Sequence, residues 1–295
     1  MAYSSRPASN PNNKNPETRR NNWLWNCLLL FIFPITCLVL VLSVYFLMPF
    51  RTNLLILGID YTEPGSFIGR SDTIILSTVI PFEPYVGMIS IPRDLWVSIP
   101  GVGENRINTA HFFAEANSPG SGPQATRNTV KANFGIDPQY YVRFRFDSVR
   151  EIVDSLGGLD IVLDKPMASY DAGSYHLTGN KALAFIRHRL GSDDFFRMEN
   201  GQFLIKSVLK QAVRPSNWAR FPTLFKVTNR AIDTNIPLIL WPRIGLAFLR
   251  AGSGGLDSKI VSRDMVTPFT TDQGASVLIP QWDKIRPKIN EMFGK

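Results

Sequence analysis

The stretch NLLILGID, residues 53–60, determines the fold class of this chain. Its apolar residues run without a polar break until Gly-Ile-Asp. Such a run indicates a strand buried on both faces, in a sheet that helices cover on both sides. In these sheets ligands bind beyond the carboxyl ends of the strands, and Asp60 lies there. The stretch therefore predicts an α/β domain with a functional site near Asp60.

Further segments continue this pattern of strands and helices. We expect strands at residues 73–80, 85–91, 95–99, 140–146 and 158–163, and helices at residues 147–156, 180–186 and 197–213. Asp147 is the expected N-cap of its helix, and Gly157 and Gly158 are expected to end it. Strand 140–146 alternates, so Arg143 and Arg145 belong either to a solvated strand face or to a second anion site. No linker interrupts residues 50–295, which favours one domain.

An apolar segment precedes this domain. Residues 27–48, CLLLFIFPITCLVLVLSVYFLM, carry no charge, and Trp23 and Trp25 stand before them. A helix of this length, at about 1.5 Å per residue, spans a hydrocarbon core of about 30 Å. A cleaved signal peptide has a shorter apolar region and ends in small residues. The segment FLMPFR follows here instead, so we expect an uncleaved transmembrane signal anchor over residues 23–48.

The first 22 residues are rich in Asn, Pro and Ser and are predicted to be disordered. Their basic residues outnumber the single acid Glu17. This positive charge is either a cluster that sets membrane topology or a contact with nucleic acid. The positive-inside rule places residues 1–22 in the cytoplasm and the domain, residues 49–295, outside. This single-pass topology excludes cytosolic cofactors such as ATP.

The formal net charge is +8, which predicts an anionic partner such as nucleic acid, membrane headgroups or a phosphorylated substrate. Cys27 and Cys37 both lie in the apolar segment, and the chain has no cysteine after them. The three histidines, His111, His176 and His188, have no metal-ligand spacing. A disulfide framework and a zinc site are therefore excluded from the domain.

Two aspartates form a candidate metal site. Asp60 ends the first strand, and Asp72 in GRSDT precedes the second. Two carboxylates without cysteine or histidine form a hard oxygen site that suits Mg²⁺ or Mn²⁺, completed by water and substrate phosphate. The alternative is that each aspartate only forms a turn or caps a helix.

Five arginines stand beside Gly, Pro or Asp rather than along polar helix faces: Arg70, Arg93, Arg187, Arg189 and Arg197. If FIRHR, residues 185–189, is extended, its two arginines share one side and His188 faces the other. The guanidinium fork matches phosphate oxygens bidentately. The alternative for each is a solvated residue or an ion-pair partner. Five such arginines together with two acids favour a diphosphate-and-metal site. No Walker loop, G-x-G-x-x-G or nucleophile elbow occurs, so a nucleotide-binding fold does not explain the charge.

These motifs, in this order, strongly resemble the LytR-CpsA-Psr family over residues 53–212. The segments that carry the resemblance are LLILGID, RSDTIIL, MISIPRDLWVSIPG, RINTAH, IVDSLGGLDI, LTGNKALAFIRHR and DFFR.

The resemblance implies an α-β-α sandwich with a central mixed β-sheet. It also implies transfer of a glycopolymer from an undecaprenyl-type diphosphate lipid to peptidoglycan, through a new phosphodiester bond. The family's metal-binding acids match Asp60 and Asp72, with Mg²⁺ or Mn²⁺ as cofactor. Its diphosphate-binding residues match the five arginines, of which Arg93, Arg187 and Arg189 are also expected to stabilise the transferred phosphoryl group. An apolar tunnel is expected for the polyprenyl chain.

Asp94 is either the general base or a residue that orients Arg93. RMENGQ, residues 197–202, departs from the arginine and paired glutamines of the family, so Gln202 is the one glutamine left for the diphosphate site. Arg106 replaces a common lysine and preserves the charge.

Three functions agree with these residues. The first is a membrane-anchored, metal-dependent phosphotransferase acting on a polyprenyl-diphosphate-linked glycan and a peptidoglycan acceptor. The second is a polyprenyl-diphosphate phosphatase, with water in place of the sugar hydroxyl. The third is a non-catalytic envelope regulator that binds lipid diphosphate. The short tail has no helix-turn-helix pattern, so we expect no nucleic-acid partner.

Overall fold

The computed structural model describes residues 16–47, 50–60, 66–81, 83–188, 194–252 and 255–294. The chain forms two compact units, Met1–Met48 and Pro49–Lys295. The first contains helix α1, Pro16–Leu47. Within it, Leu28–Phe46 is long and apolar enough to cross a membrane.

Helix α1 begins inside the segment that was predicted to be disordered. The predicted boundary lay after residue 22, whereas the helix starts at Pro16. Pro is favoured in the first turn of a helix, and the Glu and Arg residues that follow are good helix formers. Once the apolar segment is helical, each further turn costs little, so the helix extends toward the amino terminus. Residues 1–15 of the predicted tail lie outside the described residues.

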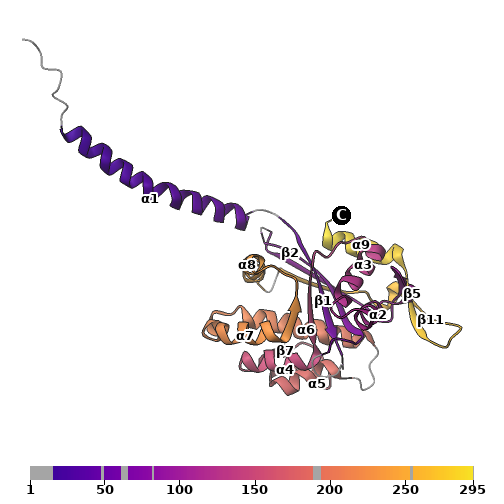
Figure 1. Cartoon of the computed structure of the whole chain (residues 1–295). Coiled ribbons are helices and arrows are strands. Elements are labelled where there is room, and N and C mark those ends of the chain that lie inside the picture. The colour runs from indigo at the N-terminus through magenta and orange to yellow at the C-terminus, as the bar shows by residue number, and fades with distance from the viewer. Residues whose placement is uncertain are drawn as a thin grey trace, which may run out of the picture. The chain divides into compact units, whose positions relative to one another are not determined.

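The second unit is built on a mixed sheet, which confirms the predicted fold class (Figure 1). Its six strands have the order β10-β3-β2-β1-β6-β9. Their bounds are β1 Thr52–Ile59, β2 Ser71–Ile80, β3 Tyr85–Ile91, β6 Tyr140–Arg145, β9 Ile232–Thr234 and β10 Leu256–Ile260. β1 pairs antiparallel with β2 and parallel with β6, while β3 pairs antiparallel with β2 and parallel with β10.

Within the described residues, three short hairpins stand outside this sheet. They are β4–β5, β7–β8 and β11–β12, with bounds β4 Trp96–Ile99, β5 Gly103–Arg106, β7 Leu159–Leu163, β8 Gly173–Leu177, β11 Val266–Thr270 and β12 Ser276–Pro280. The predicted strands 95–99 and 158–163 therefore exist, but they pair locally rather than in the main sheet.

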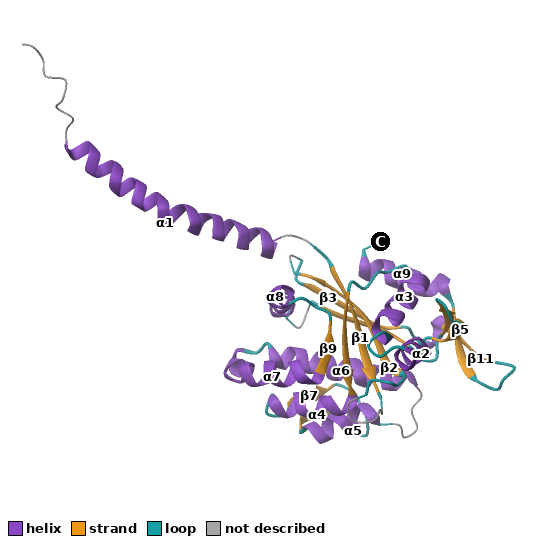
Figure 2. Ribbon diagram, viewed as in Figure 1, coloured by secondary structure: helices purple, strands orange, loops and turns teal. Residues whose placement is uncertain are grey.

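Helices cover both faces of the sheet (Figure 2). On one face Leu55 and Leu57 of β1 share a core with α3 and α9. On the other face Leu54 shares a core with α8, since successive strand residues point to opposite sides. The bounds of the main helices are α2 Thr109–Asn117, α3 Gly122–Phe134, α4 Phe146–Ser155, α5 Gly179–Arg187, α6 Asp194–Ala212, α7 Phe221–Ala231, α8 Trp241–Ala251 and α9 Trp282–Phe293. Short 3₁₀ helices occur at η1 Pro215–Arg220, η2 Leu238–Leu240 and η3 Arg263–Met265.

Two local predictions for α4 have different outcomes. The helix ends as expected before Gly157 and Gly158, whose φ angles of 81° and 94° are left-handed and suit glycine. Asp147, however, is not its N-cap. The N-cap is Arg145, and the Asp147 carboxylate instead lies 3.3 Å from Nη2 of Arg187.

Candidate active site

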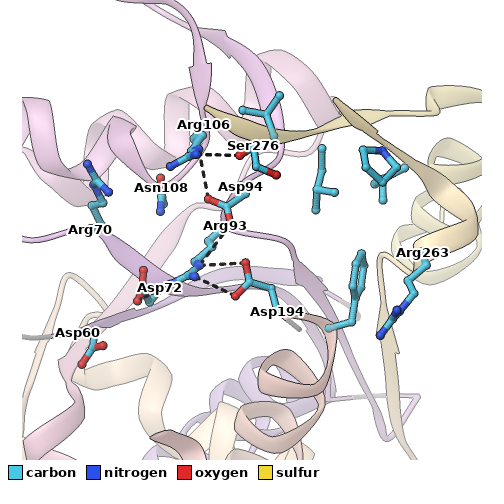
Figure 3. Close-up of a pocket in the computed structure, with 15 residues that line it drawn as sticks. Asp60, Arg70, Asp72, Arg93, Asp94, Arg106, Asn108, Asp194, Arg263 and Ser276 are labelled. Carbon is cyan, nitrogen blue, oxygen red and sulfur yellow. Dashed lines mark hydrogen bonds and ion pairs between the residues drawn. The ribbon is translucent and has the colours of Figure 1, made fainter. Parts of the chain in front are cut away.

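Three polar segments meet at one end of the sheet. β1 and β3 end there and β2 begins there, because β2 runs antiparallel to both. Asp60 follows β1, Asp72 lies at the start of β2, and Arg93 follows β3. All three side chains line one cavity of about 710 Å³ (Figure 3). The convergence expected from the sequence is therefore present.

An irregularity in strand pairing sets the position of Asp72. Gly58 is opposite Thr73 and Ile59 is opposite Ser71, so Asp72 is an extra residue between these partners. Such a bulge turns a side chain away from its regular alternation, and bulges are common beside active sites. The Asp72 carboxylate is thereby available to arginines from two other elements.

Arg93 joins three carboxylates. Its Nη1 lies 2.9 Å from Oδ2 of Asp72, and its Nε and Nη2 lie 3.1 and 2.9 Å from the two carboxylate oxygens of Asp194. Nε is also 3.5 Å from Oδ2 of Asp94. The contact with Asp194 is the bidentate, charge-assisted geometry that guanidinium favours. A phosphate group offers oxygens of the same kind to the same fork.

The first turn of α6 supplies a second arginine to Asp72. Asp194 is the first residue of this helix, and Arg197 follows one turn later. Nη1 of Arg197 lies 3.2 Å from Asp194, and Nη2 lies 3.3 Å from Oδ2 of Asp72. Asp72 therefore accepts from both Arg93 and Arg197, as expected if these arginines belong to one site.

Arg187 reaches the site from α5. It is the last residue of this helix, and its Nη2 lies 3.4 Å from Oδ1 of Asp60. The expectation of an extended FIRHR segment is therefore wrong up to Arg187, because the amphipathic helix continues through it, and extended backbone begins only at His188. Arg189 lies outside the described residues, so its predicted alignment with Arg187 stays a prediction.

The two remaining predicted diphosphate ligands lie in different surroundings. Arg70 is exposed and lines the cavity. The Gln202 side chain is buried, and its Nε2 donates to the carbonyl oxygens of Met88 and Lys259 at 3.2 and 2.9 Å. Gln202 thus connects α6 to strands β3 and β10 and does not line the cavity. We therefore omit it from the diphosphate site proposed below.

Asp94 and Asp194 form a hydrogen-bonded pair in the cavity wall. Burial and the hydrogen bond with Asp194 raise the pKa of Asp94 to about 6. Burial alone would also raise the pKa of Asp194, but the hydrogen bond from Asp94 and the charges of Arg93 and Arg197 outweigh it and lower that pKa. The shared proton therefore resides on Asp94, which loses it around pH 6.

A buried ion-pair network corrects the interpretation of Arg143. This residue is 4% exposed, and it pairs with Glu115 at 2.8 Å and with Asp233 at 2.7 Å. Its Nη1 lies 3.2 Å from Nε2 of His111, whose Nδ1 lies 2.9 Å from the carbonyl of Gly69. Strand β6 lies inside the sheet between β1 and β9, so this arginine is not on a solvated face.

The sequence reasoning missed the wall contributed by the C-terminal β11–β12 hairpin. The backbone N–H of Leu278 donates to the Asp94 carbonyl at 3.0 Å, and Nη2 of Arg106 donates to the Ser276 carbonyl at 2.7 Å. Asn108 and Arg263 line the same cavity. The motifs RINTAH and DFFR contain Asn108 and Asp194, so these two had a sequence signal. The hairpin had none that tied it to the site.

Together, the fold and the cavity define a class of α/β proteins with an arginine- and aspartate-lined cavity at one end of a mixed sheet. A family model gives the more specific assignment. It matches residues 50–291, and the chain belongs to this family, the LytR_cpsA_psr family.

Curated relatives share part of their length with this chain. It is 30% identical over 191 residues to the polyisoprenyl-teichoic acid–peptidoglycan teichoic acid transferase TagU of Bacillus subtilis, covering 62% of this chain and 60% of TagU. It is 28% identical over 195 residues to the regulatory protein MsrR of Staphylococcus aureus, covering 63% of this chain and 57% of MsrR. The chain thus spans about three fifths of the length of these relatives.

Solved structures share its fold. TagV of B. subtilis superposes with a TM-score of 0.67 at 22% identity, over 84% of this chain and 98% of TagV. TagT bound to LIIa-WTA gives a TM-score of 0.64 at 20% identity, over 83% of this chain and 91% of TagT.

Proposed function

We propose that this protein is a membrane-anchored phosphotransferase that moves a glycopolymer from a polyprenyl diphosphate carrier to peptidoglycan. The observation that carries the proposal is the position of Arg93 between Asp72 and Asp194 in the cavity, with Arg197 on the same Asp72 oxygen. Arginines held by carboxylates are positioned in advance for phosphate oxygens. The transferase function of the similar protein TagU adds support.

The arginines bind and polarise the diphosphate in this proposal. Arg70, Arg93 and Arg187, with Arg189 as a predicted fourth, contact the phosphate oxygens, while Arg197 keeps Asp72 in place. The acceptor's sugar hydroxyl oxygen forms a bond to the phosphorus that bears the glycan. The bond from this phosphorus to the lipid phosphate breaks, so a phosphodiester forms and polyprenyl phosphate leaves. Fixed guanidinium groups stabilise the negative charge that develops on the transferred phosphoryl group and on the departing lipid phosphate.

Asp94 is the proposed acceptor of the hydroxyl proton. It lines the cavity, and its pKa of about 6 leaves most of it ionised at neutral pH. A base whose pKa lies near the working pH is both available and effective. Asp194 and Arg106 hold its orientation, the latter through Nε at 3.4 Å.

Asp60 and Asp72 are the proposed ligands of Mg²⁺ or Mn²⁺. No group of three or more His, Cys, Asp or Glu suited to a metal occurs in the part of the chain that the structure describes. Magnesium is nevertheless usually bound by one or two carboxylates together with substrate phosphate, and both aspartates line the cavity. The donor set therefore fits. When bound, the cation would neutralise phosphate charge beside the arginines.

Helix α1 is the proposed anchor, with the amino terminus in the cytoplasm and the catalytic domain outside. The apolar stretch Leu28–Phe46 supports the span, and the basic residues that precede it support the orientation. This placement brings the cavity to the compartment that contains peptidoglycan.

The test is transfer of a polyprenyl-diphosphate saccharide to peptidoglycan strands by the full chain in detergent, with and without Mg²⁺. We expect Arg187→Ala plus Arg189→Ala to reduce turnover at least about 100-fold. The matched control is Lys226→Ala plus Arg230→Ala on the exposed side of α7, which should retain turnover. Unchanged turnover in the Arg187→Ala plus Arg189→Ala variant would contradict the assignment of these arginines to the site.

The products separate the other two functions. A phosphatase would release a glycan phosphate or inorganic phosphate at the same rate whether or not peptidoglycan is present. A regulator would bind the lipid diphosphate without any turnover.

A further inference from the structure

Exposed aromatic side chains lie together on η1 and α7. Trp218, Phe221 and Phe225 are 59%, 58% and 49% exposed. Residues three and four positions apart share one side of a helix, and the rings of Phe221 and Phe225 stack with their centroids 6.4 Å apart. An exposed apolar group of this kind marks a surface that a partner covers.

The charge around these aromatic residues is positive. No acid occurs between Glu199 and Asp233, and this stretch contributes six basic residues to a chain of formal net charge +8. Arg214 and Arg220 flank Trp218 in the sequence, and both are exposed. Helices that lie in the headgroup region of a membrane combine Trp and Phe with Lys and Arg in this way. An anionic bilayer matches both features, because its phosphates lie directly over its apolar chains.

This surface lies at the end of the sheet away from the cavity. Helix α6 begins at Asp194 in the cavity wall. Further along the helix, Nε2 of Gln202 donates to the Lys259 carbonyl at 2.9 Å. One turn later, Nζ of Lys206 donates to the Leu256 carbonyl at 3.3 Å. The helix therefore runs antiparallel to β10, and its 19 residues extend about 28 Å from the cavity.

η1 begins three residues after α6 ends, so it lies at the end of the sheet where β3 and β10 start. Figure 1 shows α7 and α8 across the domain from β5 and β11, which contain cavity residues.

The chain enters the domain at this same end. β1 and β3 both run antiparallel to β2, so β1 also begins there. Phe50 stands just before β1, and its carbonyl accepts a hydrogen bond from Nη2 of Arg243 in α8 at 3.0 Å. Leu238, five residues before Arg243, is 72% exposed. Three peptide units, at most about 11 Å, separate Phe50 from Leu47 at the end of α1.

We propose that these residues form a membrane-docking face, in which Trp218, Phe221 and Phe225 insert between acidic lipid headgroups and Arg214 and Arg220 contact the phosphates. The inference rests on the proposed anchoring by α1 and goes beyond the transfer reaction. Docking fixes the orientation of the domain, with the cavity directed away from the bilayer. The tunnel expected for the polyprenyl chain then bridges the distance between bilayer and cavity. Because docking needs a bilayer, it does not affect transfer measured in detergent.

The experiment measures hydroxyl-radical oxidation of individual side chains in the full chain, inserted through α1 in nanodiscs that hold one copy each. One set of nanodiscs contains phosphatidylcholine alone, and the other contains about one third phosphatidylglycerol. The matched controls within the same chain are Phe113 of α2 and Phe269 of β11, which are exposed aromatic residues outside the docking face. No turnover is needed, so the outcome is independent of the transferase proposal.

In the anionic nanodiscs we expect the three aromatic residues of the docking face to be oxidised at least about fivefold more slowly than in the neutral ones, because inserted side chains are withdrawn from water. A salt concentration of about 1 M should remove much of this protection, since it screens the contacts of Arg214 and Arg220 with the phosphates. Phe113 and Phe269 should be oxidised at the same rate in both lipids.

A variant tests whether the aromatic residues act together. In Phe221→Ser plus Phe225→Ser, Trp218 should lose its protection in anionic nanodiscs while Tm stays unchanged, since both rings are exposed. Phe113→Ser is the matched control and should leave Trp218 protected.

Equal oxidation of Trp218, Phe221 and Phe225 in both lipids, with the chain incorporated, would overturn the docking face and leave the anchor standing. A chain that fails to copurify with nanodiscs would overturn the anchor and the docking face together. Soluble poly(glycerol phosphate) is added to the neutral nanodiscs as a final comparison. If this polymer protects the face and the anionic lipid does not, the partner is an anionic polymer and the membrane assignment is wrong.

Discussion

The Nη1 atom of Arg93 lies 2.9 Å from Oδ2 of Asp72, so a predicted phosphate ligand and a predicted metal ligand hold each other in place. The cavity wall contains four arginines and four aspartates and is balanced in formal charge. Arg187 and Arg197, which pair with Asp60 and Asp72, add two more positive charges, and Asp147, which also pairs with Arg187, offsets one of them. A diphosphate that enters this site finds excess positive charge already fixed in position.

The first prediction concerns the fork of Arg93. Arg93→Lys keeps the charge but cannot contact Asp72 and both oxygens of Asp194 at once. We expect transfer to slow about 100-fold, the scale of one lost transition-state donor. Arg230→Lys, at an exposed position on α7, is the control for the same exchange and should be neutral. Initial rates of saccharide transfer measure this effect. A rate for Arg93→Lys within about threefold of wild type would contradict the role of the Arg93 guanidinium.

The second prediction concerns the pH dependence of transfer. Burial and the hydrogen bond with Asp194 raise the pKa of Asp94 to about 6, so its basic form predominates above that pH and disappears below it. We expect kcat/KM to fall about tenfold per unit below pH 6 in the wild type. Asp94→Asn should be slow at every pH and should not show this fall of kcat/KM below pH 6. If the variant still shows the fall and only raises donor KM, Asp94 orients Arg93 instead. Unfolding curves at each pH control for stability.

The third prediction links His111 to stability at low pH. Burial, reinforced by the charge of Arg143, lowers the pKa of His111 from 6.5 to about 4, although the Gly69 carbonyl, Glu115 and Asp233 favour its charged form. Between these pH values the unfolded chain binds the proton and the native state does not. Stability is therefore complete above pH 6.5 and decreases toward pH 4.

We expect this group to remove about 2 kcal/mol from the unfolding free energy between pH 7 and pH 5. Urea unfolding at the two pH values measures it. His111→Gln should start less stable but show a smaller pH effect. His176→Gln, whose side chain is 58% exposed, should keep the wild-type difference. Equal pH effects in all three proteins would contradict a neutral buried His111.

The fourth prediction concerns Gln202. Its Nε2 connects two backbone carbonyls inside the domain, so Gln202→Ala should lower the unfolding free energy by about 2 kcal/mol. Donor KM should stay unchanged at a temperature where the variant is folded. Gln124→Ala, which removes the bond donated to Asn128 and the bond accepted from Arg127 on the exposed surface, is the matched control and should cost less than about 0.5 kcal/mol. A raised donor KM without loss of stability would indicate that Gln202 does belong to the diphosphate site.

Segments with a strong local pattern were predicted correctly. The apolar strands at residues 53–60, 73–80 and 85–91 and the helix over residues 197–213 are present within one or two residues at most bounds, α6 beginning three residues earlier. Errors arose where a partner decides the outcome. Strand 140–146 alternates as an exposed strand would, but Arg143 is buried because Glu115 and Asp233 satisfy its charge. The strand pattern of residues 95–99 gave no indication that its partner is β5 rather than the main sheet.

The sequence alone determined the apolar span, the buried strands and the residue types of the site, because these follow from local hydrophobicity and from motifs contiguous in the chain. Only the tertiary structure decided which charges meet. The pairing of Asp72 with Arg197, the burial of Gln202 and the docking of β12 against Asp94 each join residues far apart in the chain. Such contacts depend on strand order and packing, and local patterns contain no record of either.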